Sequence, residues 1–234
     1  MNILILMAGE GTRLKDHYNE PKPYIKIDNK RIIEIVMENI NFNSHYILVA
    51  RTEYAKKYNL SEIGKKYLKS FDILPLDEKT EGAAISALKA KNHINNNEEL
   101  IIVNSDQYLE GDIKSAIDYF RKSKADGGIL TVKKYNEKKW SYVKINEKGI
   151  ATSVAEKNPI SNDATVGLYY FRFGSDFVKY AEEMINKNIK VNNEFYLCPV
   201  YNEFINNKKK ILIYEIQKLW PLGTLEEIEA YKKK

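Results

Sequence analysis

The sequence predicts an α/β fold from three observations. Apolar runs of strand length alternate with longer segments of helical periodicity along most of the chain. The run LIIV at residues 100–103 is apolar without interruption, which is typical of a strand covered on both faces. No linker rich in glycine, proline or serine divides the 234 residues, and no internal repeat is found. We therefore expect one α/β domain.

The individual elements follow from the same patterns. Strands are expected where short apolar runs occur, and helices where apolar residues recur with helical spacing. In the first half, the predicted strands are residues 2–7, 45–50, 72–75 and 100–103, and the predicted helices are 31–40, 53–58, 61–68, 82–93 and 111–124.

The pattern changes after residue 126. Four segments of strand character follow in close succession, at residues 127–134, 140–146, 152–156 and 165–172. Helices at 176–186 and 194–206, a strand at 211–215 and a helix at 225–232 complete the prediction. Because no linker bounds this β-rich stretch, we interpret it as an elaboration of one sheet.

Composition narrows the function. The chain has 37 Lys and Arg against 32 Asp and Glu, a net charge of +5 that is spread along the sequence. This distribution argues against nucleic acid as the main partner and suits an anionic small molecule. Cys198 is the only cysteine, so a disulfide framework is excluded and a reducing cytoplasm fits. The three histidines lack metal-ligand spacing, and no GxSxG elbow occurs.

The amino terminus carries no recognisable targeting segment. The apolar stretch at residues 3–8 is shorter than a signal-peptide core and far shorter than the roughly 20 residues that span a bilayer. We expect a mature cytoplasmic protein that begins at Met1, without membrane insertion. A homo-oligomer is compatible with the sequence.

A glycine-rich turn follows the first predicted strand, and open sheets place their ligands at strand ends. Gly9 and Gly11 leave backbone N–H groups free to point at an anion, Thr12 adds a hydroxyl, and Arg13 adds a planar, bidentate phosphate donor. The turn lacks the third glycine of GxGxxG and the lysine of a Walker A loop. Two prolines hold Lys22 on a stiff segment, as a second cation for the same phosphates. An ordinary turn with a surface lysine is the alternative.

Asp106 comes just after the buried strand at 100–103. A carboxylate there is well placed to hold Mg²⁺, which usually binds through one or two carboxylates plus substrate phosphates. Aspartate at a strand end can also simply start a turn. Taken alone, this motif does not decide between the two.

Taken together, these motifs resemble those of the sugar-1-phosphate nucleotidyltransferase family. The resemblance rests on GEGTRL at 9–14, PKP at 21–23, NSD at 104–106, EKNP at 156–159, VGLYYF at 166–171 and WPLGT at 220–224. It covers nearly the whole chain, and the order and spacing of the motifs are more specific than any one of them. It implies a single-domain three-layer sandwich with a mixed, mostly parallel, Rossmann-like sheet and a β-rich elaboration on the acceptor side. Residues of about 1–125 would bind a nucleoside triphosphate, and those of about 126–234 a sugar phosphate.

The resemblance also implies roles for single residues. Arg13, Lys22 and Asp106 would be catalytic, and Asp106 would hold Mg²⁺, the expected cofactor. The nucleotide would contact Ala8, Gly9, Gly11, Thr12, Arg13, Thr80, Gly82 and Ala83, with Gly82 allowing close approach of the base. Glu156 would bind sugar hydroxyls and Lys157 the sugar phosphate, with Ser141 and Gly167 beside them.

Two positions depart from the family pattern. Ser141 stands where many members have glycine in the strand that passes the sugar, so we expect a reshaped acceptor pocket. Relatives commonly carry a second metal-binding aspartate two residues before the glycine of the late motif, where this chain has Pro221. Asp106 is then expected to be the only protein carboxylate on the ion, unless the alignment slips and Asp77 or Glu194 reaches it.

The function that this resemblance implies is transfer of a nucleoside monophosphate to a sugar 1-phosphate, with release of pyrophosphate. The NDP-sugar would serve synthesis of a surface polysaccharide or glycoconjugate. Two alternatives stay open: a cytidylyltransferase for a non-sugar phosphate such as phosphocholine, and a catalytically silent nucleotide-binding module. Retention of Arg13, Lys22 and Asp106 together argues against the silent module.

Overall fold

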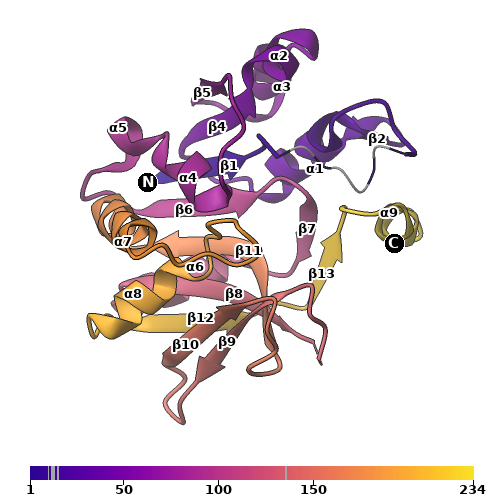
Figure 1. The fold of residues 1–234 in the computed structure, drawn as a ribbon. Helices are drawn as coiled ribbons and strands as arrows, with labels where there is room; N and C mark the ends of the chain where they lie inside the picture. Colours follow the sequence, from indigo (N-terminus) through magenta and orange to yellow (C-terminus); the bar gives the residue numbers. More distant parts are fainter. Residues whose placement is uncertain (10, 12–13, 15, 135) are drawn as a thin grey trace.

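Parallel strands form the first part of a central sheet in the computed structural model, which describes residues 1–9, 11, 14, 16–134 and 136–234 (Figure 1). The order β5 (Phe71–Leu76), β4 (His45–Arg51), β1 (Asn2–Leu6) and β6 (Leu100–Asn104) is parallel throughout. β1 therefore lies between β4 and β6, with Leu6 level with Asn104 of β6. This register brings the carboxyl ends of β1 and β6 to the same edge of the sheet.

The second part of the chain extends the same sheet. β11 (Asp163–Phe171) pairs antiparallel with β6 and with β8 (Gly127–Lys133). β9 (Ser141–Ile145) and β10 (Ala151–Glu156) continue the sheet beyond β11, and β12 (Ile211–Glu215) lies parallel to β8. The mixed, mostly parallel, Rossmann-like sheet and its β-rich elaboration are thus confirmed.

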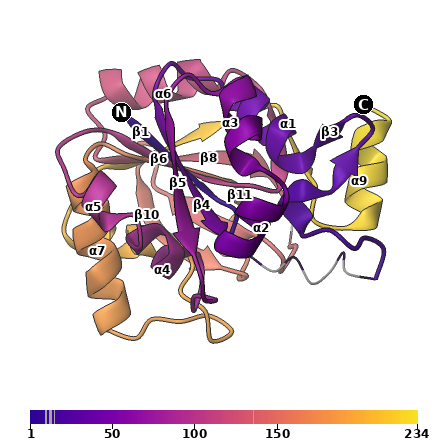
Figure 2. The same ribbon diagram turned by 90° about the horizontal axis from the view of Figure 1, so that it is seen from above.

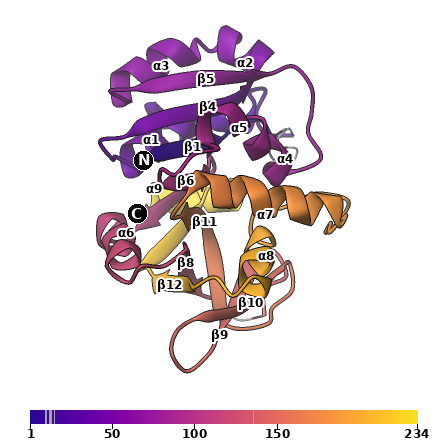
Figure 3. The ribbon, with the colours of Figure 1, turned by 90° about the vertical axis from the view of Figure 1, so that its left-hand side faces the viewer.

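Helices cover both faces of this sheet, which makes the predicted three layers (Figure 3). In β1, Ile3 and Ile5 face one apolar core and Leu4 faces the other, as the alternation of a strand requires. The first core includes residues of α1 (Ile32–Asn39), α3 (Leu60–Tyr67), α6 (Ile113–Lys122) and α9 (Leu225–Lys232), with partly buried side chains of α2 (Thr52–Lys57) packed against it. The second includes residues of α4 (Ala83–Leu88), α5 (Lys91–Ile94), α7 (Gly174–Asn186) and α8 (Val200–Asn206). Within the described part of the chain, no helix is long and apolar enough to cross a membrane.

Several short elements were not predicted. They are the 3₁₀ helix η2 (Lys22–Tyr24), the hairpin of β2 (Lys26–Ile27) and β3 (Lys30–Arg31), and the two-stranded sheet of β7 (Gln107–Glu110) and β13 (Lys218–Pro221). Each is too short to show a period, and the partner of β7 lies half a chain away. The β2–β3 hairpin lies beside α9 (Figure 2).

Two predicted helices are wrong in extent. The helix predicted at 82–93 is two helices, α4 and α5, because the chain turns at residues 89–90 and carries Ile94 beneath α7. The helix predicted at 194–206 begins only at Val200. Pro199 disfavours helical geometry in the residue before it, and the backbone of Phe195 pairs with the turn that precedes α4.

Candidate active site

The glycine turn lies directly against the second motif. β1 ends as Met7 N–H donates to Val49 O at 2.9 Å, and Ala8 and Gly9 follow beyond the sheet edge. Gly11 has φ +59°, and a Cβ there would come within 2.6 Å of Lys22 Cβ. Glycine is thus needed at residue 11 both for its backbone angle and for close contact with Lys22. Thr12 and Arg13, predicted as phosphate ligands, lie outside the described residues.

Lys22 and Asp106 form an ion pair. Lys22 Nζ donates to Asp106 Oδ2 at 2.7 Å, and the two side chains are 15% and 26% exposed. Lys22 opens η2 and Asp106 follows β6, so residues far apart in sequence meet at the carboxyl edge of the sheet. The structure therefore places the predicted cation and the predicted metal ligand in one contact.

The late motif reaches the same place. Leu222 N–H donates to Asp106 O at 2.8 Å, and Pro221 lies opposite Gln107 in the β7–β13 pair. Asp77 lies elsewhere, where it accepts a hydrogen bond from Thr52 at 2.6 Å. Glu194 lies in the segment between α7 and α8, where its backbone pairs with Val191.

The donor set around Asp106 can be tested against Mg²⁺. Among the residues that the structure describes, no group of three or more His, Cys, Asp and Glu side chains could hold a metal ion. A single carboxylate next to a turn that is predicted to bind phosphate nevertheless fits Mg²⁺, which keeps several waters and takes oxygen ligands from bound phosphates. Asp106 is the residue that would hold it.

The predicted base-binding turn has an unexpected neighbour. Thr80 Oγ1 lies 2.5 Å from Ser86 Oγ and donates to Gly82 O at 3.2 Å, which holds the turn before Ala83 opens α4. Gly82 has φ +117°, and a Cβ there would lie 2.6 Å from Phe195 N. The contact that requires glycine at residue 82 is therefore made by the protein's own backbone. Contact between this turn and a nucleobase stays a prediction.

In the half of the chain that is predicted to bind the acceptor, Glu156 and Ser141 lie opposite each other on β10 and β9. The Ser141 hydroxyl donates a hydrogen bond to Glu156 Oε2. Burial raises the pKa of the Glu156 carboxyl and nearby Glu194 raises it further, while the Ser141 hydrogen bond and Lys157 oppose the shift. Lys157 Nζ donates to Tyr196 Oη at 2.5 Å. Ser141 thus orients the carboxylate that the family pattern assigns to sugar binding.

Gly167 occupies an irregularity in β11. The pairing of β11 with β8 shifts between Thr165 and Tyr169, and Gly167 within that interval has φ +69°. A Cβ at Gly167 would lie 2.5 Å from Asn104 Nδ2 and 2.6 Å from Gln107 Oε1. The missing side chain lets two amide groups, from the end of β6 and the start of β7, pack against β11.

Gln107 is a candidate site residue that the sequence does not single out. Its side chain is buried, with 6% of the residue exposed, and its Nε2 has no hydrogen-bond partner among the described residues. A buried amide without a partner is costly, and a substrate oxygen would supply one. Only its place directly after Asp106 could have drawn attention to it.

Cys198 and Tyr169 line the interior behind Glu156. Burial raises the pKa of the Cys198 thiol, and Tyr169 Oη lies 3.1 Å from Thr165 Oγ1. Both residues are almost fully buried. Cys198 is a packed small hydrophobe, as predicted, and it is unsuited to act as a nucleophile.

Comparison with known structures agrees with this fold. A structure of the nucleoside-diphosphate-sugar pyrophosphorylase from Vibrio cholerae RC9 superposes with a TM-score of 0.86 at 22% identity, covering 100% of both chains. A structure of UDP-glucose pyrophosphorylase complexed with UDP-glucose gives a TM-score of 0.78 at 18% identity, covering 100% of this chain and 99% of that one. At these identities the likeness shows the fold.

Sequence comparison bears on the family as well as on the fold. The chain is 26% identical over 179 residues to the mannose-1-phosphate guanylyltransferase catalytic subunit beta of Drosophila pseudoobscura pseudoobscura. The match covers 72% of this chain and 47% of that protein, so the chain spans about half the length of this relative. A family model described as nucleotidyl transferase matches residues 2–212. The chain belongs to the nucleotidyl transferase family, as its motifs predict.

Proposed function

We propose that this protein transfers a nucleoside monophosphate from a nucleoside triphosphate to a sugar 1-phosphate and releases pyrophosphate. The observation that carries this proposal is the Lys22–Asp106 ion pair, which joins the glycine turn to the Asp106 carboxylate at the carboxyl edge of the sheet. Membership of the nucleotidyl transferase family supports the same chemistry.

The reaction is an in-line displacement at phosphorus. An oxygen of the sugar phosphate attacks the α-phosphorus of the triphosphate, a new P–O bond forms, and the bond to the pyrophosphate oxygen breaks. No proton transfer to carbon and no covalent enzyme intermediate is required, so catalysis consists of positioning and charge stabilisation. Backbone N–H groups around Gly9 and Gly11 hold the phosphates, while Arg13 and Lys22 stabilise the charge on the α-phosphate and on the departing pyrophosphate.

Mg²⁺ held by Asp106 and the triphosphate would supply further neutralisation of phosphate charge. Asp106 has a second task in this chain, because it orients Lys22 at 2.7 Å. Its replacement would therefore disturb both the metal site and the lysine.

The two substrates occupy different parts of the chain in this proposal. Residues of about 1–125 bind the nucleotide through the glycine turn and the turn at Thr80–Gly82, and those of about 126–234 bind the acceptor. Glu156, held by Ser141, accepts hydrogen bonds from sugar hydroxyls, and Lys157 contacts the sugar phosphate. The amide of Gln107, which lies against Gly167, adds a hydrogen-bond donor.

The product is an NDP-sugar for polysaccharide or glycoconjugate synthesis. We place the reaction in the cytoplasm, where a lone buried cysteine such as Cys198 stays reduced. The side chains that select the base would lie in and near the turn at 80–84. Those that select the sugar would lie on β9, β10 and β11.

The test is a matrix of the common nucleoside triphosphates against acceptor phosphates, with Mg²⁺ present and pyrophosphate release as the readout. The acceptors are mannose 1-phosphate, glucose 1-phosphate, N-acetylglucosamine 1-phosphate and phosphocholine. Release with a sugar 1-phosphate supports the proposal. Release with CTP and phosphocholine alone would favour the cytidylyltransferase alternative, and nucleotide binding without release in any pair would favour a silent module.

A further inference from the structure

The segment between α7 and α8 contains a tight hairpin. Val191 N–H donates to Glu194 O at 3.0 Å, and Glu194 N–H donates to Val191 O at 3.0 Å. Asn192 and Asn193 between them have φ +49° and +61°, the geometry of a two-residue turn with both central residues in the left-handed region. Asparagine tolerates this region better than most residues do, so the sequence itself favours this turn.

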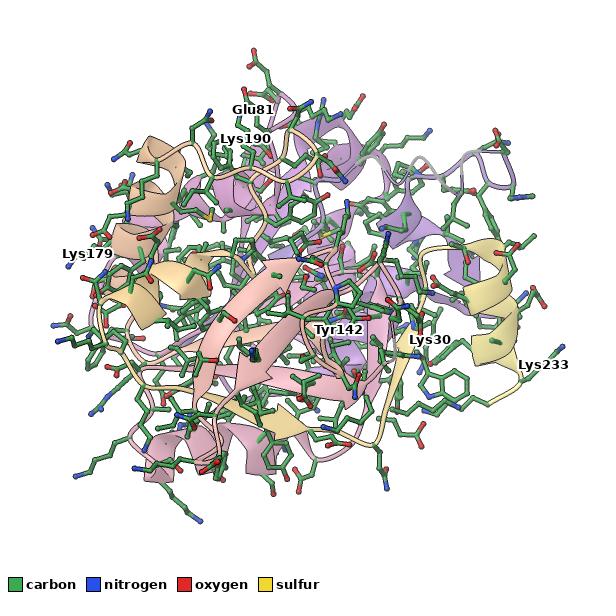
Figure 4. All side chains as sticks on the ribbon, turned by 60° about the horizontal axis from the view of Figure 1, so that its bottom comes forward. Lys30, Glu81, Tyr142, Lys179, Lys190 and Lys233 are labelled. Atoms are coloured by element: carbon green, nitrogen blue, oxygen red, sulfur yellow. The ribbon has the colours of Figure 1, made fainter. Side chains whose placement is uncertain are left out.

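One end of the hairpin pairs with the predicted base-binding turn. Phe195 N–H donates to Glu81 O at 2.8 Å, and Ala84 N–H donates to Phe195 O at 3.0 Å. Gly82 has no side chain where the Phe195 backbone passes. The side chains of the two segments also form an ion pair, with Lys190 Nζ 2.6 Å from Glu81 Oε2, and Figure 4 shows these two side chains together. The turn at 81–84 and the hairpin are therefore held by two backbone hydrogen bonds and an ion pair.

The next residue holds the acceptor-side lysine. Lys157 Nζ donates to Tyr196 Oη at 2.5 Å and lies 4.6 Å from the centre of the Tyr196 ring. The backbone of Lys157 is itself constrained, with φ +54° and an N–H that donates to Trp140 O at 3.0 Å. A lysine side chain is flexible, so a phenol that fixes its ammonium removes rotamer freedom before the substrate arrives.

We propose that the segment of residues 190–196, which we call the bridging hairpin, links the base-binding turn to Lys157. Within this segment Tyr196 is the positioning residue, because its hydroxyl holds the Lys157 ammonium. This rests on the proposed function in so far as Lys157 contacts the sugar phosphate. Phe195 and Tyr196 are consecutive, so a displacement of the turn at 81–84 moves the phenol that holds Lys157. The hairpin thus joins the two substrate regions through neighbouring peptide groups.

The first test is a double-mutant cycle on acceptor use. Tyr196→Phe keeps the ring and removes the hydroxyl, and we expect the KM for the sugar 1-phosphate to rise about 10-fold, as for the loss of a hydrogen bond to a charged group. The KM for the nucleotide should change less than about 2-fold, which is much less than the effect of losing one such hydrogen bond. In a Lys157→Met background, the same substitution should have no further effect, because Tyr196 acts through Lys157. Full additivity of the two substitutions would contradict the positioning role.

The second test does not depend on turnover. Competitive labelling of lysine amines with acetic anhydride, followed by mass spectrometry, reports how strongly each ammonium is held. Lys179 on α7 is the internal control, since it lies apart from the bridging hairpin (Figure 4). Labelling of Lys157 relative to Lys179 should rise severalfold in Tyr196→Phe.

Two further variants test the link to the base-binding turn. Gly82→Ala forces the Phe195 backbone to move, and Lys190→Met removes the ion pair with Glu81 without touching the backbone. Both should increase labelling of Lys157, Gly82→Ala more strongly, while circular dichroism confirms folding. Unchanged labelling in all three variants would overturn the proposal. Absence of pyrophosphate release by the wild-type protein would instead contradict the proposed function. The labelling result would still decide whether Tyr196 positions Lys157, because labelling does not depend on turnover.

Discussion

Among single residues, Lys22 and Asp106 pair opposite charges at 2.7 Å where the glycine turn meets the end of β6. The ammonium and the carboxylate are partly exposed, which leaves the pair accessible to a triphosphate and to Mg²⁺. A lysine held in place by a carboxylate is oriented before the substrate binds, so less order has to be imposed during the reaction. This arrangement leads to a quantitative expectation for Lys22.

Lys22→Ala should lower kcat by about 100-fold, a cost of roughly 3 kcal/mol of transition-state stabilisation, because charge on the departing pyrophosphate is no longer neutralised. Steady-state kinetics with the active substrate pair measures this, and nucleotide affinity should fall less. Lys26→Ala is a matched control, since Lys26 is an exposed lysine on the nearby strand β2. An unchanged kcat would remove Lys22 from the catalytic set.

Glu156 is expected to link acceptor use to pH. Burial raises the pKa of its carboxyl, so on acidification Glu156 takes up a proton at a higher pH than an ordinary glutamate does. A protonated carboxyl accepts hydrogen bonds from sugar hydroxyls less well. The acidic limb of the kcat/KM profile for the sugar 1-phosphate should therefore lie above the usual glutamate range, and Glu156→Gln should abolish that limb and lower kcat/KM about 10-fold or more.

The raised pKa of Glu156 also affects the free energy of unfolding. Because the pKa of Glu156 is raised in the folded state, the native protein binds this proton more tightly than the unfolded chain, and the charged carboxylate destabilises the fold at neutral pH. Glu156→Gln should increase the free energy of unfolding at pH 7, and the difference should vanish as the pH falls below the pKa. A Glu156→Gln protein that is less stable at neutral pH would contradict this account.

Among the structural elements, β11 owes its shape to the irregularity at Gly167. Gly167→Ala should lower the free energy of unfolding by roughly 2–4 kcal/mol, from left-handed strain together with overlap with the Asn104 and Gln107 amides. Gly149→Ala is the matched control, because Gly149 has φ +71° and a Cβ there would meet no other part of the described chain within 4 Å. This control should cost only the strain of about 1–2 kcal/mol. Urea denaturation compares the two.

Equal destabilisation by Gly167→Ala and Gly149→Ala would mean that the amides of Asn104 and Gln107 make room without cost. Acceptor binding gives a second comparison. Only Gly167→Ala should raise the KM for the sugar 1-phosphate, since Gly149 lies in the turn between β9 and β10, away from the amides.

The sequence predicts the long elements well because burial imposes a visible period on them. β1, β6 and α7 bury one or both faces and match their predicted ranges to within about two residues. β7 and β13 could not be predicted, because each is stabilised mainly by pairing with the other. The late start of α8 likewise depends on a contact of Phe195 with a turn that lies more than a hundred positions earlier in the chain.

The sequence predicts which residues form the candidate site and what chemistry they offer. It does not predict which of these residues contact one another. Motif order indicated Lys22, Asp106, Glu156 and Lys157, whose chemistry suits phosphate and sugar. The partners of these groups are set by tertiary structure: no local pattern shows that Asp106 pairs with Lys22 or that Tyr196 holds Lys157. The roles of Thr12 and Arg13 stay predictions from the motif.

At the scale of the whole molecule, the predicted metal site at Asp106 joins segments from the start, middle and end of the chain. Lys22, Asp106 and Leu222 meet there, and Asp106 supplies the carboxylate. With one carboxylate already paired to an ammonium, the protein should bind Mg²⁺ weakly without nucleotide, and the ion should arrive with the triphosphate. Calorimetry with MgCl₂ tests this: tight Mg²⁺ binding by the nucleotide-free protein would contradict it, and Asp106→Asn should abolish turnover while circular dichroism stays unchanged.

The transfer reaction itself is tested most directly by following the α-phosphate. A nucleoside triphosphate labelled at its α-phosphorus is incubated with the protein, Mg²⁺ and the sugar 1-phosphate that releases pyrophosphate fastest, and the products are separated by chromatography. Attack by the sugar phosphate on the α-phosphorus predicts that the label enters an NDP-sugar, whereas label at the γ-phosphorus leaves entirely in pyrophosphate. Label from the α-position that appears only in free nucleoside mono- or diphosphate, with the sugar phosphate unchanged, would contradict the proposed transfer.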